Sequence, residues 1–309
     1  MSLVLIKEII VYSFPVITLI GLITNTTSFV IFSRKKFQNT IFSTYFRFFI
    51  TFQNLNLILP INKILEFNFN IYFSRISNFT CKLRNFYGYF NLACSAWLLV
   101  AISFDRYLCI AYPARFLFRK KVFFQILACS IIIEFHVCYF VSSWFYYLKE
   151  TKISSTNETL NQTRKIYKCV PSGIETDIME LFEHILIPFF LMILFTSLTS
   201  RHVFQSRKIA CSTLTTVNND RKFAISSITI NILFIFFNLP QFVLNMINDY
   251  TLLFANHLYL LRVFQSITYF FHYIDLISIF FINYFVNSMF RKEFDLMIFN
   301  RVKCITNHN

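Results

Sequence analysis

Residues 81–113 read CKLRNFYGYFNLACSAWLLVAISFDRYLCIAYP. Cys81 lies 25 residues before Arg106, and most of the residues between them are apolar. An α-helix rises about 1.5 Å per residue, so this run spans about 37 Å, which exceeds the roughly 30 Å of a hydrocarbon core. The stretch therefore predicts a membrane-spanning helix with a cysteine at one end and Asp105-Arg106-Tyr107 at the other.

Other parts of the chain are equally apolar. Charged residues make up 14% of the 309 residues, against about 25% in an average soluble domain. A helix needs roughly 20 mainly apolar residues to cross a bilayer. Seven stretches of about this length predict an all-α membrane protein, a seven-transmembrane helix bundle. They are Ile9–Phe32, Thr44–Phe69, Asn85–Ile110, Val122–Leu148, Asp177–Phe204, Lys222–Ile247 and Leu258–Tyr284.

Lysine and arginine are distributed unevenly between the loops. The loops on the side of the C-terminus carry 18 of the 29 Lys and Arg residues, and cytoplasmic loops carry such an excess. We therefore expect a multi-pass plasma-membrane protein with an extracellular N-terminus and a cytoplasmic C-terminus. It would form one domain, with residues 1–8 outside, residues 9–284 in seven spans and residues 285–309 as an interfacial helix and tail. Such a basic face suits anionic membrane lipids rather than nucleic acid, because short loops divide the charges.

The cysteines and glycosylation sequons fit this topology. Of the eight cysteines, Cys81 and Cys169 fall outside the membrane, where an oxidising environment permits a disulfide between them. Three Asn-x-Thr sequons also fall outside, so glycans are expected on them. These are at Asn78, Asn157 and Asn161.

The end of the third span carries the most specific signal. Residues 103–111 read SFDRYLCIA, Pro113 follows, and the run lies one helix length from an outer cysteine. On these residues the chain resembles the rhodopsin-like (class A) G-protein-coupled receptors over roughly residues 9–299. It is most similar to divergent neuropeptide or chemosensory receptors of invertebrates. Further matches are Gly21, Asn25, Ser43-Thr44, Pro188, Phe234, Leu239-Pro240 and Phe290-Arg291.

Several positions depart from the pattern of that family. Asn54 replaces the acid that is usual in the second span, and Asn238 stands where many relatives carry a tryptophan. The seventh span ends Ile282-Asn283-Tyr284, without the family's Asn-Pro-x-x-Tyr motif. The resemblance thus implies the family's fold. Because these motifs are missing, we expect either a different activation mechanism or a divergent receptor of one lineage.

The resemblance implies a switch at the inner ends of the third and sixth spans. Within Asp105-Arg106-Tyr107, Arg106 would hold the resting state and then contact a heterotrimeric G protein; an ordinary positive-inside arginine is the alternative. Asp220 matches the family's acidic partner of that arginine, or it is a solvated loop acid. Pro240, beside Asn238 in the sixth span, implies either a hinge or a static bend.

Polar residues in the outer halves of the spans are the candidates for ligand binding, because intramembrane polar groups tend to face the bundle interior. Hydrogen bonds between helices would explain any one of them equally well, but as a set they favour a pocket. The candidates are Asn85, Tyr89, Glu180, Glu183, His184, Gln241, Asn245, Gln265, Tyr269 and His272.

The expected ligand is a short peptide with a positive charge. Glu175, Asp177, Glu180 and Glu183 form an acidic run at the outer end of the fifth span, and half-buried carboxylates need a partner. If these acids instead pair with Lys165, Lys168 or Arg262, the pocket would take a small neutral molecule, as a chemosensory receptor does. The seventh span lacks the lysine that retinal requires, and Gly88 stands near where amine receptors place an aspartate.

The chain continues beyond the seventh span with Phe290, Phe294, Met297 and Ile298 at helical spacing among basic residues. This pattern predicts an interfacial amphipathic helix. Cys304 follows it and is a palmitoylation candidate, an unmodified cysteine being the alternative.

The sequence contains no catalytic constellation, no phosphate-binding glycine loop and no metal-spaced His/Cys cluster. We therefore expect no enzyme, no cofactor and no metal site. A transporter or channel, or a co-receptor that does not signal alone, are the alternatives to a signalling receptor. Transporters often show paired halves and broken helices, and the sequence shows neither.

Overall fold

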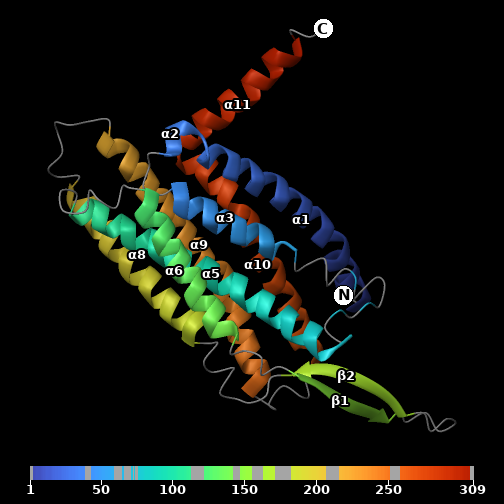
Figure 1. Cartoon of the computed structure of the whole chain (residues 1–309). Coiled ribbons are helices and arrows are strands. Elements are labelled where there is room, and N and C mark those ends of the chain that lie inside the picture. Colours follow the sequence, from blue (N-terminus) through green and yellow to red (C-terminus); the bar gives the residue numbers. More distant parts are fainter. Residues whose placement is uncertain are drawn as a thin grey trace.

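The computed structural model describes residues 3–38, 43–58, 76–112, 122–141, 147–154, 163–170, 182–206, 216–250 and 258–306, together with residues 65, 71 and 73. Long helices lie side by side in one bundle, which confirms the all-α membrane fold (Figure 1). Seven of these helices correspond to the seven predicted spans. They are α1 (Leu3–Phe32), α3 (Ser43–Asn56), α5 (Asn78–Ala111), α6 (Val122–Val141), α8 (Ile187–Ser206), α9 (Thr216–Tyr250) and α10 (Leu258–Val286).

Shorter elements join or extend these helices. The turn α2 (Lys35–Gln38) follows α1, and a π-helical turn, η3 (Phe182–Leu186), precedes α8. The strands β1 (Tyr147–Ser154) and β2 (Thr163–Val170) form an antiparallel hairpin. The helix α11 (Ser288–Thr306) begins two residues after α10 ends, where the sequence predicted a separate helix.

The described helices differ in length and apolar content, and so in whether each could cross a membrane alone. Three stretches are long and apolar enough to cross one, at Tyr12–Phe32 in α1, Asn78–Ala111 in α5 and Ile267–Val286 in α10. Shorter apolar stretches lie in α6, at Val122–Cys138, and in α9, at Ile225–Pro240. Such variation in apolar content is expected in a bundle, because helices that contact one another can carry more polar residues than a lone span can.

Several predicted boundaries differ from the structure: α1 begins before Ile9, α9 begins before Lys222, and α3 ends at Asn56, where the second span was predicted to reach Phe69. Two other differences have a clear physical reason. The third span begins at Asn78 rather than Asn85, because Ser77 and Thr80 form a capping box that satisfies the first backbone N–H groups. The prediction that the fourth span runs to Leu148 is wrong, since Leu148 pairs with Cys169 in the hairpin. Aromatic residues, which are frequent at the membrane interface, extend the apolar run there beyond the end of the helix.

The bundle has two distinct ends (Figure 1). The hairpin lies at the end where α1 and α5 begin, and α2 and the start of α11 lie at the opposite end. This arrangement agrees with a chain that crosses the bundle seven times, because the outer loop and the C-terminal helix then fall on opposite sides.

The core is densest toward the end that carries α11. Phe32 of α1 stacks on Phe46 of α3 with ring centroids 5.0 Å apart, and Phe290 of α11 lies 5.4 Å from Phe32. All three side chains are buried. The first turns of α11 are therefore part of the hydrophobic core.

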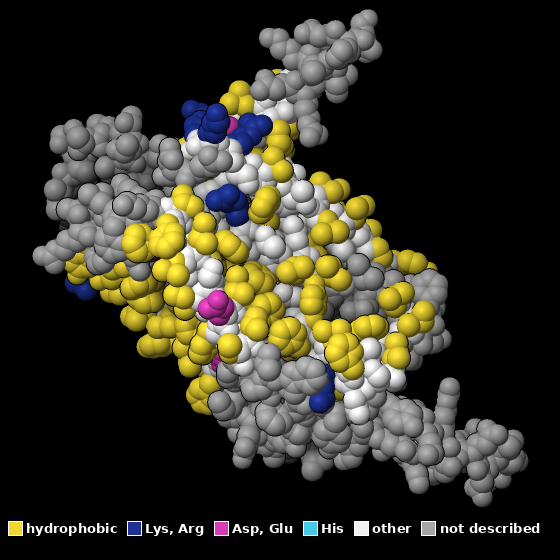
Figure 2. Space-filling view, viewed as in Figure 1, with side chains coloured by type: hydrophobic (Ala, Val, Ile, Leu, Met, Phe, Trp, Pro, Cys, Tyr) yellow, Lys and Arg dark blue, Asp and Glu magenta, His cyan; other side chains and the backbone are white. Residues whose placement is uncertain are grey.

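The surface around the bundle is mostly apolar (Figure 2). Leu19, Ile23 and Phe236 are each more than half exposed on helices predicted to span the membrane. Exposed apolar side chains of this density suit contact with lipid and would favour aggregation in water.

Candidate functional site

The predicted switch residues Asp105, Arg106 and Tyr107 lie near the C-terminal end of α5, and Cys81 lies near the N-terminal end of the same helix. The Asp105 and Arg106 side chains are both buried, and Arg106 is among the largest buried side chains of the described residues. A guanidinium group at this depth requires compensating interactions inside the bundle. Tyr107 stacks on Phe195 of α8 with ring centroids 6.3 Å apart and lies 5.9 Å from the His202 ring.

Three further switch residues, Asp220, Asn238 and Pro240, lie on α9. Pro240 is inside this helix, as predicted. Asp220 is also on α9, but its side chain lies outside the described part of the chain, so its pairing with Arg106 stays a prediction.

A polar node joins α5, α8 and α9 close to the switch. Asn231 Nδ2 donates to Ser103 Oγ at 2.6 Å and to Thr196 Oγ1 at 2.9 Å. Ser103 Oγ donates its own hydrogen to the Leu99 carbonyl, so it must accept from Asn231, which fixes the orientation of the amide. The sequence prediction missed Asn231, although an amide inside an apolar span is the signal that marks such residues.

A second polar cluster joins α9 to α10 about two helical turns further along α9. Asn238 Nδ2 donates to the Phe234 carbonyl at 2.8 Å and to Asp275 Oδ2 at 3.0 Å. Since the Phe234 carbonyl can only accept, the amide oxygen faces away from it, and it lies 2.6 Å from His272 Nδ1. Two residues predicted separately, Asn238 for switching and His272 for the ligand, are thus in direct contact.

Asp275 is the residue of this cluster that the sequence prediction missed. Its side chain is buried between α9 and α10, and its backbone carbonyl accepts from Ser278 Oγ at 2.8 Å. An acid in the middle of a predicted span is expensive and usually functional. This signal was present in the sequence and would have identified Asp275.

Glu183, a predicted ligand residue, lies inside the bundle against α5 and α6. Its carboxylate Oε1 is 3.7 Å from His136 Nε2, and its backbone carbonyl accepts from Trp97 Nε1 at 3.2 Å. The Trp97 and His136 rings lie 6.0 Å apart. His136 and Trp97 were not predicted. The competing interpretation named Lys165, Lys168 or Arg262 as partners of the acids, and their side chains lie outside the described part of the chain.

The remaining ligand candidates are only partly described. Asn85, Tyr89 and Tyr269 are half-buried, and Tyr269 packs beside Tyr273 in a small cluster with Phe14 and Leu276. The helices contain four other candidates whose side chains lie outside the described part of the chain, and Glu180 lies wholly outside it. Those four are His184, Gln241, Asn245 and Gln265.

A cavity of about 490 Å³ lies between α8 and α9. Asn231 and Thr196 line it together with isoleucines that include Ile193 and Ile232, both more than half exposed. It opens toward the lipid-facing surface and contains none of the predicted ligand residues. We therefore do not place the extracellular ligand there.

Contacts that join α1 to the rest of the bundle occur at residues matched to the family. Asn25 Nδ2 donates to the Leu276 carbonyl of α10 at 3.1 Å. Gly21 lies where α1 approaches α10 and the residue that follows α3. An added Cβ there would be 2.7 Å from Leu57 Cδ1 and 2.8 Å from Ile277 Cγ2, so this approach requires glycine.

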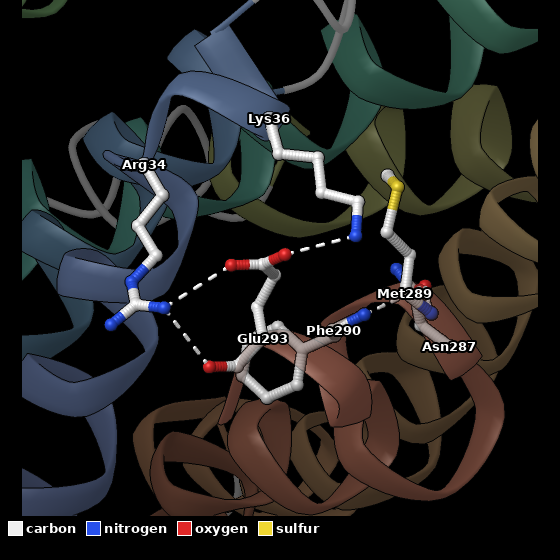
Figure 3. Close-up of polar contacts among 6 residues, drawn as sticks. All are labelled: Arg34, Lys36, Asn287, Met289, Phe290 and Glu293. Carbon is white, nitrogen blue, oxygen red and sulfur yellow. Dashed lines mark hydrogen bonds and ion pairs between the residues drawn. The ribbon is translucent and has the colours of Figure 1, made fainter. Parts of the chain in front are cut away.

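The helix α11 is attached to α1 and α2 by charged groups (Figure 3). Glu293 accepts from Arg34 Nη1 at 3.2 Å and from Lys36 Nζ at 2.9 Å. Asn287 Oδ1 caps the helix by accepting from the N–H groups of Met289 and Phe290. Of the predicted apolar stripe, Phe290 is buried, Phe294 and Met297 are half-buried and Ile298 is exposed.

The predicted covalent sites are less completely described. Cys81 is disulfide-bonded, and Cys169 lies in β2 with its side chain outside the described part, so their pairing stays a prediction. Asn78 is exposed at the start of α5, whereas Asn157 and Asn161 lie outside the described residues. The Cys304 side chain is likewise outside them.

Comparisons with known proteins agree with this geometry. The family described as 7 transmembrane receptor (rhodopsin family) matches residues 24–290. The chain is similar to Free fatty acid receptor 2 of Homo sapiens, with 30% identity over 105 residues, 33% of this chain and 31% of the relative. It is also similar to Free fatty acid receptor 2 of Rattus norvegicus and of Mus musculus, with 31% identity over 108 residues, 34% of this chain and 32% of each relative. The matched segment spans about a third of the length of these curated relatives.

Proposed function

Because this chain belongs to the rhodopsin family of seven-transmembrane receptors, we propose that it binds an extracellular ligand between the outer halves of α5, α9 and α10 and activates a heterotrimeric G protein. The family consists of multi-pass plasma-membrane receptors that signal without enzymatic activity. Membership in it removes the transporter and channel alternatives. The remaining question is how ligand binding in the outer half of the bundle could change the structure around Arg106 in the inner half.

The observation that carries the proposal is the pair of polar clusters on α9. Asn238 holds α9 to α10 through Asp275 and contacts the ligand candidate His272. Asn231 holds the same helix to α5 at Ser103, two residues before Asp105. Seven residues of helix separate the two asparagines, about 10 Å along the axis and on one face. A ligand that displaces His272 would thus shift α9 and alter the surroundings of Arg106.

This function requires the hairpin end to face outward. The Lys and Arg residues support the orientation, since 18 of the 29 fall on the side of the C-terminus. Among them are Arg34, Lys35, Lys36, Arg291 and Lys292, at the end that carries α2 and α11 (Figure 2). Cytoplasmic ends of spans carry such an excess. Residues 1–8 and the hairpin would then lie outside the cell and the C-terminal tail inside.

A short peptide is the first ligand candidate. The two strands of the hairpin form a two-stranded sheet among the described residues, and an extended peptide can add to an open strand edge through main-chain hydrogen bonds. Tyr89 and Tyr269 are half-buried and could hold an apolar or aromatic ligand end. Because Glu183 lies against His136, a cationic peptide would depend on Glu175, Asp177 and Glu180 instead.

A small carboxylate is the second ligand candidate. The similar receptors are named for free fatty acids. On α5, Arg84 is half-buried, and a guanidinium group binds a carboxylate with good geometry. The two strands of the hairpin add five cations and one acid, Glu150. The hairpin cations are Lys149, Lys152, Arg164, Lys165 and Lys168.

One experiment tests the function and separates the two ligand classes. Cells that express the receptor are exposed to a library of short peptides and to monocarboxylates of increasing chain length, with G-protein dissociation as the readout. Arg84→Gln should reduce the potency of a carboxylate by roughly tenfold to a hundredfold, because it removes a charge-assisted hydrogen bond. Glu180→Gln should do the same for a cationic peptide and leave a carboxylate unaffected.

The control is Arg106→Ala at equal surface expression, which should abolish the response to either class. A response that survives Arg106→Ala would contradict coupling through this arginine. A response only to neutral molecules, unchanged in both ligand-site variants, would favour the chemosensory alternative. Dissociation that appears only when a second receptor is co-expressed would favour the co-receptor alternative.

A further inference from the structure

A patch of exposed cations lies at the corner where α2 meets the start of α11. Lys35 and Lys36 on α2 and Arg291 and Lys292 on α11 are exposed, and basic side chains gather at this corner in the space-filling view (Figure 2). The acids nearby are Glu293, which is buried, and Asp295, one helical turn after Arg291. The corner is therefore positive, although it contains acids.

The Glu293 carboxylate neutralises only part of this charge. It lies between the Arg34 and Lys36 side chains, which reach it from one side as α11 presents it from the other (Figure 3). Lys36, then Arg34, hold the pKa of Glu293 below its ordinary value, so the group is ionised at neutral pH. Lys35, Arg291 and Lys292 are exposed beyond this ion-pair cluster.

The exposed side chains of α11 lead us to expect this corner at the level of lipid headgroups. On α11 the Phe290 side chain is buried against the bundle, whereas Leu296, Ile298 and Phe299 are exposed by 50%, 43% and 70%. Apolar side chains exposed along a helix that leaves a membrane bundle place that helix in the interface, with its outer side in contact with acyl chains. The cations of its first turn then lie beside the phosphates of the adjoining leaflet.

We propose that this corner, formed by Lys35, Lys36, Arg291 and Lys292, binds the headgroup of an anionic phospholipid that carries a phosphomonoester, such as a phosphorylated phosphatidylinositol. Clusters of four or more Lys and Arg beside a span or on an interfacial helix attract such lipids. Each phosphomonoester carries close to two negative charges and three acceptor oxygens. One such headgroup could therefore engage several of these cations, which the single net charge of phosphatidylserine does less well.

The test uses the full receptor in nanodiscs of phosphatidylcholine that contain either a fluorescent phosphatidylinositol bisphosphate or phosphatidylserine at matched total charge. Energy transfer from a dye on the receptor measures lipid enrichment around the protein. Arg291→Ala should weaken enrichment of the bisphosphate lipid about fivefold, the effect expected for one cation near the surface. Arg201→Ala removes an exposed arginine of α8 outside this corner, and it should leave enrichment unchanged.

Asp295→Asn provides a variant of opposite sign. It removes an acid one helical turn after Arg291 and keeps the ion pairs of Glu293, so enrichment should rise, an effect that loss of folding would not produce. If Arg291→Ala and Arg201→Ala reduced lipid enrichment equally, the proposal would be overturned, because the lipid would then respond to the total positive charge of this side of the receptor. Equal enrichment of phosphatidylserine, or binding of soluble inositol phosphate as tight as that of the lipid, would overturn it too. None of these readouts needs a G protein, so failure here is separate from failure of the proposed function.

Discussion

At position 21 an added methyl group would lie 2.7 Å from Leu57 Cδ1, whereas at position 88 it would meet no atom within 4 Å. Both glycines are inside helices. Gly21→Ala should therefore lower stability by about 1 kcal/mol or more through overpacking, while Gly88→Ala should raise it by roughly 0.5–1 kcal/mol through helix propensity. Thermal unfolding of the two purified variants in one detergent measures the difference. Shifts of the same sign would contradict the packing described around Gly21.

Asn238→Leu tests the cluster between α9 and α10. The change removes the hydrogen bonds to Asp275 and His272 and leaves polar groups buried without them, which should destabilise the receptor by about 1–3 kcal/mol. Thr229→Val on the same helix is the control, because its exposed hydroxyl bonds only to the Ile225 carbonyl among the contacts described. It should change stability by less than about 0.5 kcal/mol. Equal effects of both variants would show that the cluster does not hold the helices together.

Individual residues were predicted from the sequence better than their partners were. His272 and Glu183 were selected as intramembrane polar groups and Asn238 as a departure from the family pattern, and all three lie in polar contacts. Their partners Asp275 and His136 lie on other helices, 37 residues from Asn238 and 47 from Glu183. Which polar groups meet depends on the rotation and depth of each helix, and hydrophobic periodicity defines neither closely enough.

Among the elements, α11 provides a pH-dependent attachment. Lys36, then Arg34, lower the pKa of Glu293 from its ordinary value of 4.5. A lowered pKa stabilises the folded form above the unfolded pKa, and this stabilisation is lost as pH falls through the folded value. The protection factors of α11 amides, which are corrected for the intrinsic pH dependence of exchange, should therefore be high from neutral pH down to about 4.5 and fall below it. In Glu293→Gln these factors should be lower at neutral pH and nearly independent of pH, and a wild-type pH profile in this variant would rule out the ion pairs as the cause.

The hairpin and α5 make the second prediction at this scale. Cys81, at the outer end of α5, is disulfide-bonded, and we expect Cys169 of β2 to be its partner. A bridge over a loop of this length stabilises by about 4–5 kcal/mol in the chain-entropy model. Cys81→Ala and Cys169→Ala should each reduce surface expression, while Cys138→Ala, a free cysteine, should not. Peptide mapping that finds the Cys169 thiol free would exclude the pairing.

The order of the helices was predicted from the sequence, and the hairpin was not. Spans of about 20 apolar residues are a strong signal, because the bilayer fixes their length. The strands of the hairpin are eight residues each and polar, and their pairing depends on contacts between segments that are separate in the sequence. The aromatic residues before Lys149 also obscured the end of the fourth helix, since such residues occur both in spans and at their interfaces.

At the scale of the whole molecule, the ligand candidates of α5 and α9 lie toward one end of these helices, whereas Arg106 and Asp220 lie toward the other, with Asn238 between them beside His272. The helices α5 and α9 both run from one end to the other (Figure 1). Asn231 and Asn238 connect α9 to its neighbours along this path. Asn238 stands where many relatives carry a tryptophan, so hydrogen bonds take the place of a large aromatic side chain in the proposed coupling between helices.

The central claim is that Arg106 and α9 form the switch of a receptor that activates G proteins. The most direct measurement is nucleotide exchange on purified heterotrimeric G proteins by the receptor in nanodiscs, without ligand. We expect Asp220→Ala to raise basal exchange above that of the parent, because it removes the partner that holds Arg106 at rest, a coupling of about 1–3 kcal/mol. Arg106→Ala, alone or combined with Asp220→Ala, should give no exchange above that of the G protein by itself. Basal exchange equal to that of the parent in Asp220→Ala, Asp220→Asn and Arg106→Ala at matched receptor concentration would contradict the account.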